Sequence, residues 1–186
     1  MFSFKAISAA LLLVASVAAA PTSTTYDYPD GTVTLTGVTH SVVAGLAGLR
    51  FDPDNVVAEV GDIVEWHFLK VNHSIAESSF AEPCKPVADG TGFFSGFNFF
   101  VPEEGQSENV FQIVVVDKFP IWYYCPQTKG DHCQNGMAGV INQNFDNQDF
   151  SLRRYKEVAA TTGKSIVPDY EQGGAVIPNP NPDGGF

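Results

Sequence analysis

Most of the soft, metal-binding side chains of this chain are gathered in one short stretch. Residues 123–139, YYCPQTKGDHCQNGMAG, contain Cys125, His132, Cys133 and Met137. The whole chain of 186 residues has only three cysteines, four histidines and two methionines. Thiolate, imidazole and thioether groups are ligands for soft and borderline metal ions. The clustering therefore indicates a metal site.

A further histidine, His73 in the sequence VNHS, supplies a second imidazole. Two imidazoles, one thiolate and a distant thioether suit copper in a trigonal site with a weak axial methionine. The predicted ligands are therefore His73, Cys125, His132 and Met137, holding one copper ion per chain. We expect His73 to come from a separate strand, while one hairpin end offers the other three.

Other uses of these residues remain open on spacing alone. A Zn²⁺ ion could be held by His73, Cys125, His132 and Cys133. Cys125 and Cys133 could instead form a local disulfide bond, which would leave Cys84 free. A nucleophilic pair of Cys125 and His132 lacks a recognisable oxyanion motif or orienting partner. A multicopper cluster needs further histidines in H-x-H pairs, which this chain of four histidines lacks.

Short strands must position these residues. In IVEWHF, residues 63–68, Val64, Trp66 and Phe68 alternate with two polar residues, as expected for a strand with one buried face. His40 and His67 are assigned to surface or strand-edge positions. The predicted fold class is all-β, an antiparallel Greek-key β-sandwich or barrel with one C-terminal helix. The predicted strands are 32–38, 48–51, 56–60, 63–68, 109–116, 120–124 and 138–142.

The two ends of the chain differ from the central domain. A basic Lys5, an apolar run and small residues up to Ala20 are typical of a secretion signal, because the run is too short for a membrane span. Near the C-terminus, Leu152, Tyr155 and Ala159 share one helical face, with caps expected at 146–149. The predicted division is a signal peptide at 1–20, a polar leader at 21–31, the β domain at 32–144, the helix at 145–163 and a disordered tail at 164–186.

The net charge limits the classes of partner. The chain has 21 acidic and 10 basic residues, and its formal net charge is −11. Such a surface repels nucleic acids and anionic lipids. The C-terminal sequence NPNPDGGF has no hydrophobic tail for a lipid-anchor signal. We therefore expect a secreted, extracellular monomer with no membrane span, no lipid anchor and no nucleic-acid partner, and an unidentified redox partner that is basic or neutral.

The motifs resemble those of the cupredoxins, and most closely the phytocyanins and the small extracellular cupredoxins of fungi. The resemblance rests on NHSIAESSFAEPC, IWYYC and HCQNGMAGVIN, between about Thr32 and Asn142. It implies a Greek-key β-sandwich and a type 1-like copper centre with three strong ligands and Met137 as the axial ligand. The segment between Cys125 and His132 is about two residues longer than in phytocyanins, which predicts a looser or more tetragonal site.

The resemblance also implies further roles near the site. Cys84 and Cys133 would form a disulfide bond. Strand alternation agrees, since a metal-facing His132 leaves its neighbour Cys133 on the opposite side. The backbone amide of Ser74 would donate a hydrogen bond to the cysteine sulfur. Asn72 begins an N-x-S sequon and is the predicted glycosylation site, with an unoccupied sequon as the alternative.

The predicted function is that of a secreted electron carrier rather than an enzyme. A metal whose coordination positions are all filled by protein leaves no opening for a substrate. The alternative is a secreted copper-sequestering or cell-surface interaction protein in which the metal is redox-inactive or absent. An intense visible band from copper–thiolate charge transfer distinguishes the two.

Overall fold

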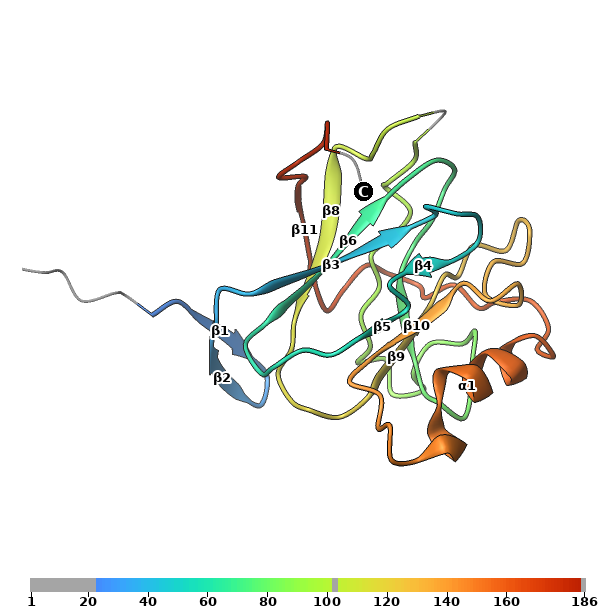
Figure 1. Ribbon diagram of the computed structural model, residues 1–186, viewed down its shortest axis with the longest axis horizontal. Coiled ribbons are helices and arrows are strands. Elements are labelled where there is room, and N and C mark those ends of the chain that lie inside the picture. Colours follow the sequence, from blue (N-terminus) through green and yellow to red (C-terminus); the bar gives the residue numbers. More distant parts are fainter. Residues whose placement is uncertain (1–22, 102–103, 185–186) are drawn as a thin grey trace, which may run out of the picture.

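Two β-sheets packed face to face form the body of the molecule (Figure 1). The computed structural model describes residues 23–101 and 104–184, so the predicted signal peptide lies outside the described residues. One sheet has the order β11-β8-β6-β3-β4 and the other the order β5-β10-β9-β7. The strands of the first sheet are β3 (Thr39–Ala44), β4 (Phe51–Asp52), β6 (Ile63–Phe68), β8 (Asn109–Val114) and β11 (Ala175–Pro178); those of the second are β5 (Asn55–Val56), β7 (Ala76–Ser78), β9 (Ile121–Tyr124) and β10 (Ala138–Ile141).

The pairing of the strands is mostly antiparallel. Only β3 with β6 and β5 with β10 run parallel among the described strand pairs. Each parallel pair joins segments that are separated by a crossover, as Greek-key sandwiches require. The all-β sandwich with one α-helix agrees with the predicted fold class.

The core lies between the sheets and is rich in aromatic rings. In β6, Val64, Trp66 and Phe68 are fully buried, as their alternation predicts. The Trp66 ring meets Tyr123 of the opposite sheet edge-on, with ring centroids 5.2 Å apart. Phe68 stacks on Phe99 at 3.9 Å. This contact network holds the two sheets at a fixed spacing and supports the loops that carry the candidate site.

The other face of β6 is also buried, which corrects the assignment of His67 to a surface or strand-edge role. His67 Nε2 lies 2.7 Å from a Glu65 carboxylate oxygen, and His67 Nδ1 lies 3.0 Å from the Gln106 side-chain oxygen. The Asn179 side chain also donates to that Gln106 oxygen, at 3.0 Å. His67 is thus linked through Gln106 to Asn179 in the C-terminal part of the chain.

The C-terminal segment is ordered, contrary to the prediction of a disordered tail. Ala175–Pro178 forms β11, which pairs antiparallel with β8 at the edge of the five-stranded sheet. The strand could not be recognised from the sequence, because the short AVIP run lies among Gly, Pro and Asn residues that are typical of irregular segments. The leader also contains structure, because β1 (Thr25–Tyr28) pairs with β2 (Gly31–Thr34) as a hairpin.

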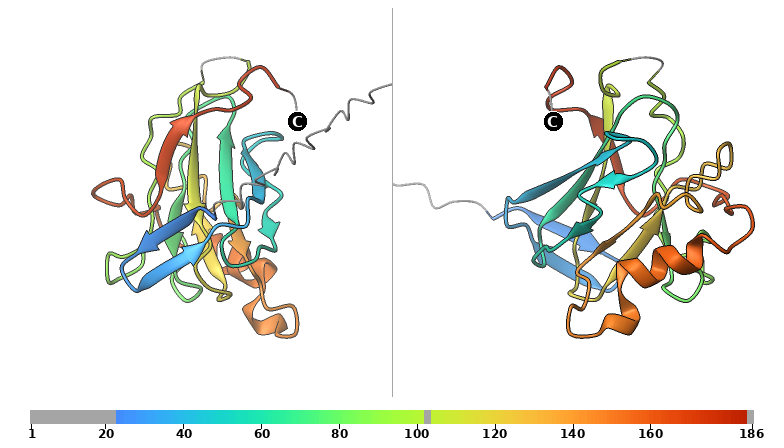
Figure 2. Two further views of the ribbon diagram at one scale, coloured as in Figure 1. Left: turned by 90° about the vertical axis from the view of Figure 1, so that its left-hand side faces the viewer. Right: turned by 45° about the vertical axis from the view of Figure 1, so that its right-hand side comes forward.

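The helix α1 (Leu152–Ala159) lies against the outer face of the four-stranded sheet, on the opposite side of the molecule from the β1–β2 hairpin (Figures 1 and 2). Ser151 caps it by accepting a hydrogen bond from the Arg154 amide. The segment expected to cap it forms a 3₁₀ turn instead, η1 (Gln148–Phe150). The predicted apolar face is buried, and Tyr155 stacks on Trp122 with centroids 5.3 Å apart.

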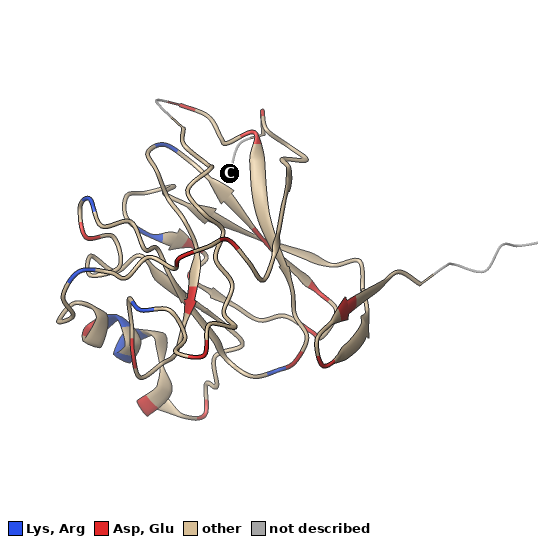
Figure 3. Cartoon of the chain, turned by 180° about the vertical axis from the view of Figure 1, so that it is seen from behind, with Lys and Arg blue, Asp and Glu red and all other residues tan. Residues whose placement is uncertain are grey.

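Charged residues lie mainly at the surface. On the side drawn in Figure 3, Asp and Glu are spread over several loops and strands, and Lys and Arg occupy fewer positions. Within the described residues, no helix has the length and apolar character needed to cross a bilayer.

Candidate metal centre

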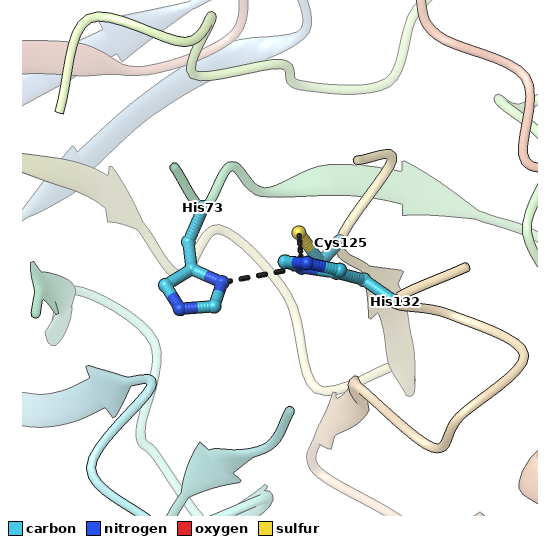
Figure 4. Close-up of side chains that lie close together, drawn as sticks. All are labelled: His73, Cys125 and His132. Atoms are coloured by element: carbon cyan, nitrogen blue, oxygen red, sulfur yellow. Dashed lines mark hydrogen bonds between the residues drawn. The ribbon is translucent and has the colours of Figure 1, made fainter. Parts of the chain in front are cut away.

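Three of the predicted ligands meet at one end of the sandwich (Figure 4). The Nδ1 atoms of His73 and His132 are 3.3 Å apart, and the Cys125 sulfur lies 3.4 Å from His132 Nδ1. All three donor atoms lie within 4.8 Å of one another. The three side chains are buried, with exposed fractions of 5% or less. Across residues 23–101 and 104–184, no other group of three or more His, Cys, Asp or Glu side chains gathers in this way.

The donors come from two places in the fold. Cys125 follows β9 directly, and Met137 precedes β10. The Cys125 amide donates to the Met137 carbonyl at 3.0 Å, and the Met137 amide donates to the His132 carbonyl at 3.0 Å. These backbone bonds close the hairpin end that was expected to carry three ligands. The sequence predicted that His73 lies on a strand, but His73 lies in the irregular segment between β6 and β7.

Gly45 is a functional position that sequence reasoning missed. It follows β3 with a φ of +96°, and a Cβ atom there would lie 2.5 Å from Nε2 of His73. The absence of a side chain therefore makes room for the imidazole ring. Nothing in the local sequence signals this contact, because Gly45 and His73 are brought together only by the folding of the chain.

Burial keeps the donor set electrically neutral when no metal is bound. Burial and the neighbouring His132 lower the pKa of His73 to about 4, although a backbone hydrogen bond at Lys70 opposes this shift. Burial also lowers the pKa of His132. Both rings are therefore neutral at pH 7 and keep a nitrogen lone pair for a metal ion.

The pKa of the Cys125 thiol is shifted upward, whereas those of the two imidazoles are shifted downward. Burial raises its pKa to about 12, whereas backbone hydrogen bonds from Gln127 and Ser74 act in the opposite direction. The Ser74 contact is the one that the resemblance implies. The hydroxyl of Ser74 is fixed separately, because it donates to the Gly96 carbonyl at 2.5 Å. The two amides thus point positive charge at the sulfur and favour its thiolate form once a cation balances the charge.

The donor set fits a trigonal metal ion. Bonds of about 2 Å in a trigonal plane place the ligand atoms about 3.5 Å apart. The two distances from His132 Nδ1, 3.3 Å to His73 and 3.4 Å to Cys125, are close to this value, and the pair of His73 and Cys125 lies within 4.8 Å. Cys84 and Cys133 form a disulfide bond with a Cα–Cα distance of 5.7 Å, and Cys125 is the free cysteine. The alternatives that used Cys133 as a zinc ligand or as the disulfide partner of Cys125 are therefore excluded.

Two further predicted residues adjoin this centre. Met137 is fully buried in the core beside the hairpin end, and its role as an axial ligand stays a prediction. Asn72 is half-buried rather than turned outward, and its carbonyl accepts a bond from Gln127 Nε2 at 3.3 Å. Glycosylation at Asn72 likewise stays a prediction.

A hollow of about 440 Å³ lies over His132. Its walls are largely apolar, and Phe100 is its most exposed ring, with 65% of its surface accessible. The longer segment between Cys125 and His132 contributes Lys129 and Gly130 to the rim. The lining consists of Leu49, Val71, Asn72, Phe100, Gln127, Lys129, Gly130 and His132.

Comparisons with known proteins identify relatives in a fungus. The chain is 36% identical over 150 residues to an "Extracellular serine-rich protein" of Arthroderma benhamiae, covering 77% of this chain and 55% of the relative. It is 34% identical over 134 residues to a "Probable GPI-anchored cupredoxin-1" of the same organism, covering 72% of this chain and 65% of the relative. The chain thus spans less than two thirds of each relative. No family model matches.

Among solved structures, reduced auracyanin from Roseiflexus castenholzii overlaps with 56% of this chain and 95% of its own. The TM-score is 0.39 and the sequence identity is 16%.

One expectation about the surroundings of the protein is contradicted. The absence of a hydrophobic tail predicted no lipid anchor, yet the second relative carries "GPI-anchored" in its name. The error has a plain cause. The prediction used only the last residues of the chain, whereas the relative extends well beyond the matched region.

Proposed function

Because the chain is a cupredoxin-like protein, we propose that it is a secreted carrier of single electrons that holds one copper ion. His73, Cys125 and His132 would be the strong ligands, and Met137 the axial one. The observation that carries the proposal is the convergence of two neutral imidazoles and one thiol, all buried, with their donor atoms within 4.8 Å of one another. Bound copper would supply a one-electron couple between its cuprous and cupric states.

The residues around the donors favour this role by keeping them in place. Gly45 leaves room for the His73 ring, and the hydrogen bonds between Cys125, His132 and Met137 fix the hairpin. The amides of Ser74 and Gln127 bond to the sulfur. A donor set that moves little when the charge of its ion changes is suited to electron transfer, because little reorganisation accompanies each transfer.

The site is better suited to a carrier than to a catalyst. Its three donor side chains are at most 5% exposed, so a substrate has no direct path to a metal ion held by them. The hollow over His132 approaches the centre from outside without opening it. We propose that electrons enter and leave through this ring and the apolar surface around Phe100.

Several features support an extracellular location. The disulfide bond between Cys84 and Cys133 is typical of proteins in oxidising compartments. One relative is named as extracellular and another as a probable GPI-anchored cupredoxin. The N-terminal sequence has the features of a secretion signal. We therefore place the protein outside the cell, in solution or at the cell surface.

Copper titration of the full chain tests the proposal. We expect one copper ion per chain, with an intense visible absorption band that disappears on mild reduction and returns on oxidation. Cys125→Ser should abolish the band and leave the fold intact by circular dichroism. His40→Gln is the matched control, because His40 is a histidine outside the site and should leave the band unchanged.

Other outcomes would contradict the proposal in distinct ways. Tight copper uptake without the visible band would indicate sequestration, and no uptake would indicate an interaction domain.

Met137→Leu should retain the colour and raise the reduction potential, because a thioether donor is lost. A colourless Met137→Leu variant would be incompatible with a weak axial role.

A further inference from the structure

A second cavity lies away from the metal centre and shares no residue with its ligands. It has a volume of about 190 Å³ and lies between the loop that follows Cys84 and the C-terminal segment 166–172. Its polar side chains are Glu77, Asp169 and Gln172, and the rest of its lining is apolar or glycine. No Lys, Arg or His side chain lines it.

Glu77 of β7 is the more buried of the two acidic residues that line this cavity. It is half-buried, and one of its oxygens accepts a long hydrogen bond from the Phe93 amide at 3.3 Å. In the described part of the chain no basic side chain forms an ion pair with it, although several other acidic residues have such partners. A carboxylate that is partly desolvated and has no counter-charge favours the approach of a cation.

Other acidic residues near Glu77 also favour the binding of a cation there. Burial raises the pKa of its carboxyl, and the nearby carboxylates of Asp89 and Asp117 raise it further, while the Phe93 amide opposes the shift. Hydrogen bonds from Thr91 lower the pKa of Asp89, which is therefore ionised at neutral pH. A positive ligand would relieve this repulsion.

The walls of the cavity suit a flat, weakly hydrated ligand. Two aromatic residues line it, Tyr170 with 63% of its surface exposed and the buried Phe93. The rim is fixed by Gln172, whose side-chain amide donates to the carbonyls of Gly90 at 2.6 Å and Gly92 at 2.7 Å. A pre-formed rim spares a ligand the entropy of ordering it.

We propose that this cavity binds a small molecule with a guanidinium head on a short apolar stem. The planar head would pair with Glu77 and stack against Tyr170, and Asp169 would add negative charge at the rim. Guanidinium is favoured over ammonium because it is planar, delocalised and more weakly hydrated, which suits a half-buried ion pair. The volume of about 190 Å³ lies below the roughly 300–1,000 Å³ of drug-sized pockets, so the ligand must be small.

Calorimetric titration of the full-length, copper-loaded protein with n-butylguanidinium chloride at pH 7 tests this proposal. We expect saturable binding that weakens with added salt, and weaker binding of n-butylammonium and n-butanol. Glu77→Gln should reduce the affinity at least about tenfold, since a charge-assisted bond is lost. Glu108→Gln is the matched control, because Glu108 is an exposed acidic residue outside the cavity.

A second variant covers the case in which Glu77→Gln does not fold. Asp169→Asn changes an exposed rim position and should weaken binding about two- to fivefold. The proposal would be overturned by the absence of saturable binding, by equal binding of n-butanol, or by tighter binding of a neutral sugar such as glucose. The visible band of the copper site should not change during the titration, so this result is independent of the proposed electron transfer.

Discussion

Gly45 limits the position of the His73 ring, which is a proposed metal ligand. Its backbone passes so close to His73 that a single methyl group would overlap with the imidazole ring. His73 is 1% exposed, and even a small shift of its ring would change the position of the donor nitrogen. The fit of the site therefore depends on a residue without a functional group.

We predict that Gly45→Ala displaces His73, weakens copper binding at least about tenfold and shifts or bleaches the visible band. Gly48→Ala is a close control, because Gly48 also has a positive φ, of +92°, but nothing lies within 4 Å of its added methyl group. Both variants share the backbone strain of an alanine at positive φ, about 1 kcal/mol. Copper titrations that gave the same result for both variants would show that strain, rather than the contact, is responsible.

Asp62 is a second residue of interest, because its hydrogen bonds determine the pKa of its carboxyl group. Its buried carboxylate accepts bonds from the Thr36 hydroxyl at 2.5 Å and the Glu59 amide at 2.9 Å, and lies 2.7 Å from His40 Nε2. Burial alone would raise its pKa, but these bonds outweigh burial and lower the pKa from 3.8 to about 2. The ionised carboxylate is thus stabilised more in the folded state than in the unfolded one.

The sign of the resulting pH dependence follows directly. The stabilisation, about 2 kcal/mol, is complete above pH 4 and is lost as the pH falls toward 2. Asp62→Asn should therefore lower the free energy of unfolding at pH 7, and the difference from the wild type should shrink at pH 2–3. Urea titrations at the two pH values measure this. A difference that did not change with pH would rule out the ionised carboxylate as its source.

At the scale of elements, the C-terminal segment acts as a brace across both sheets. β11 extends the five-stranded sheet, and the Ile166 amide donates to the carbonyl of Cys84 at 3.0 Å. The Tyr124 hydroxyl, at the end of β9, donates to the Ile166 carbonyl at 2.6 Å. The segment therefore ties the disulfide loop and the ligand-bearing hairpin to the edge of the opposite sheet.

We predict that truncation after Gly163 lowers the free energy of unfolding by at least about 2 kcal/mol, because several hydrogen bonds, including that from Asn179 to Gln106 beside His67, are lost. Tyr124→Phe, which removes one of these bonds, should account for about 1 kcal/mol. Urea unfolding monitored by fluorescence gives both values. A truncated chain as stable as the full one would contradict the bracing role.

The elements that sequence reasoning found are those with a clear local signal. β6, β8, β9 and β10 have alternating or continuous β-branched and aromatic residues and turn residues on both sides. β3 was missed although Gly45 and Gly48 mark a turn after it, and β7 was missed because three residues are too few for a period. β11 forms by pairing with the distant strand β8, and the position of His73 depends on contacts with distant residues such as Gly45. Neither can be predicted from a local sequence pattern. The three strong donors could be named from their rarity, whereas Gly45 and the cavity at Glu77 could not.

At the scale of the whole molecule, the disulfide bond joins segments that are far apart in the sequence. Cys84 and Cys133 are separated by 49 positions, and the bond closes a loop that contains β8, β9 and Cys125. Closing a loop of this size restricts the unfolded chain, and the chain-entropy account gives about 4 kcal/mol. Cys133 is also the neighbour of His132, so the same bond restrains the metal centre.

We predict that the Cys84→Ala/Cys133→Ala variant is less stable than the wild type by 2–4 kcal/mol, and that its copper band is broader because His132 is held less firmly. Unfolding in urea measures the first effect and visible spectroscopy the second. Dithiothreitol should destabilise the wild type but not the variant. An unchanged midpoint in the variant would show that packing alone holds the loop.

The neutrality of the buried donors bears on how the protein matures. Two uncharged rings and an un-ionised thiol can be enclosed without a cation to balance them, so we expect that folding and formation of the Cys84–Cys133 disulfide do not require copper. If copper binds as proposed, its loading would be an exchange in which the incoming ion displaces a proton from sulfur, and mildly alkaline surroundings would promote it. Assembly and metallation are thereby separable in time and in place.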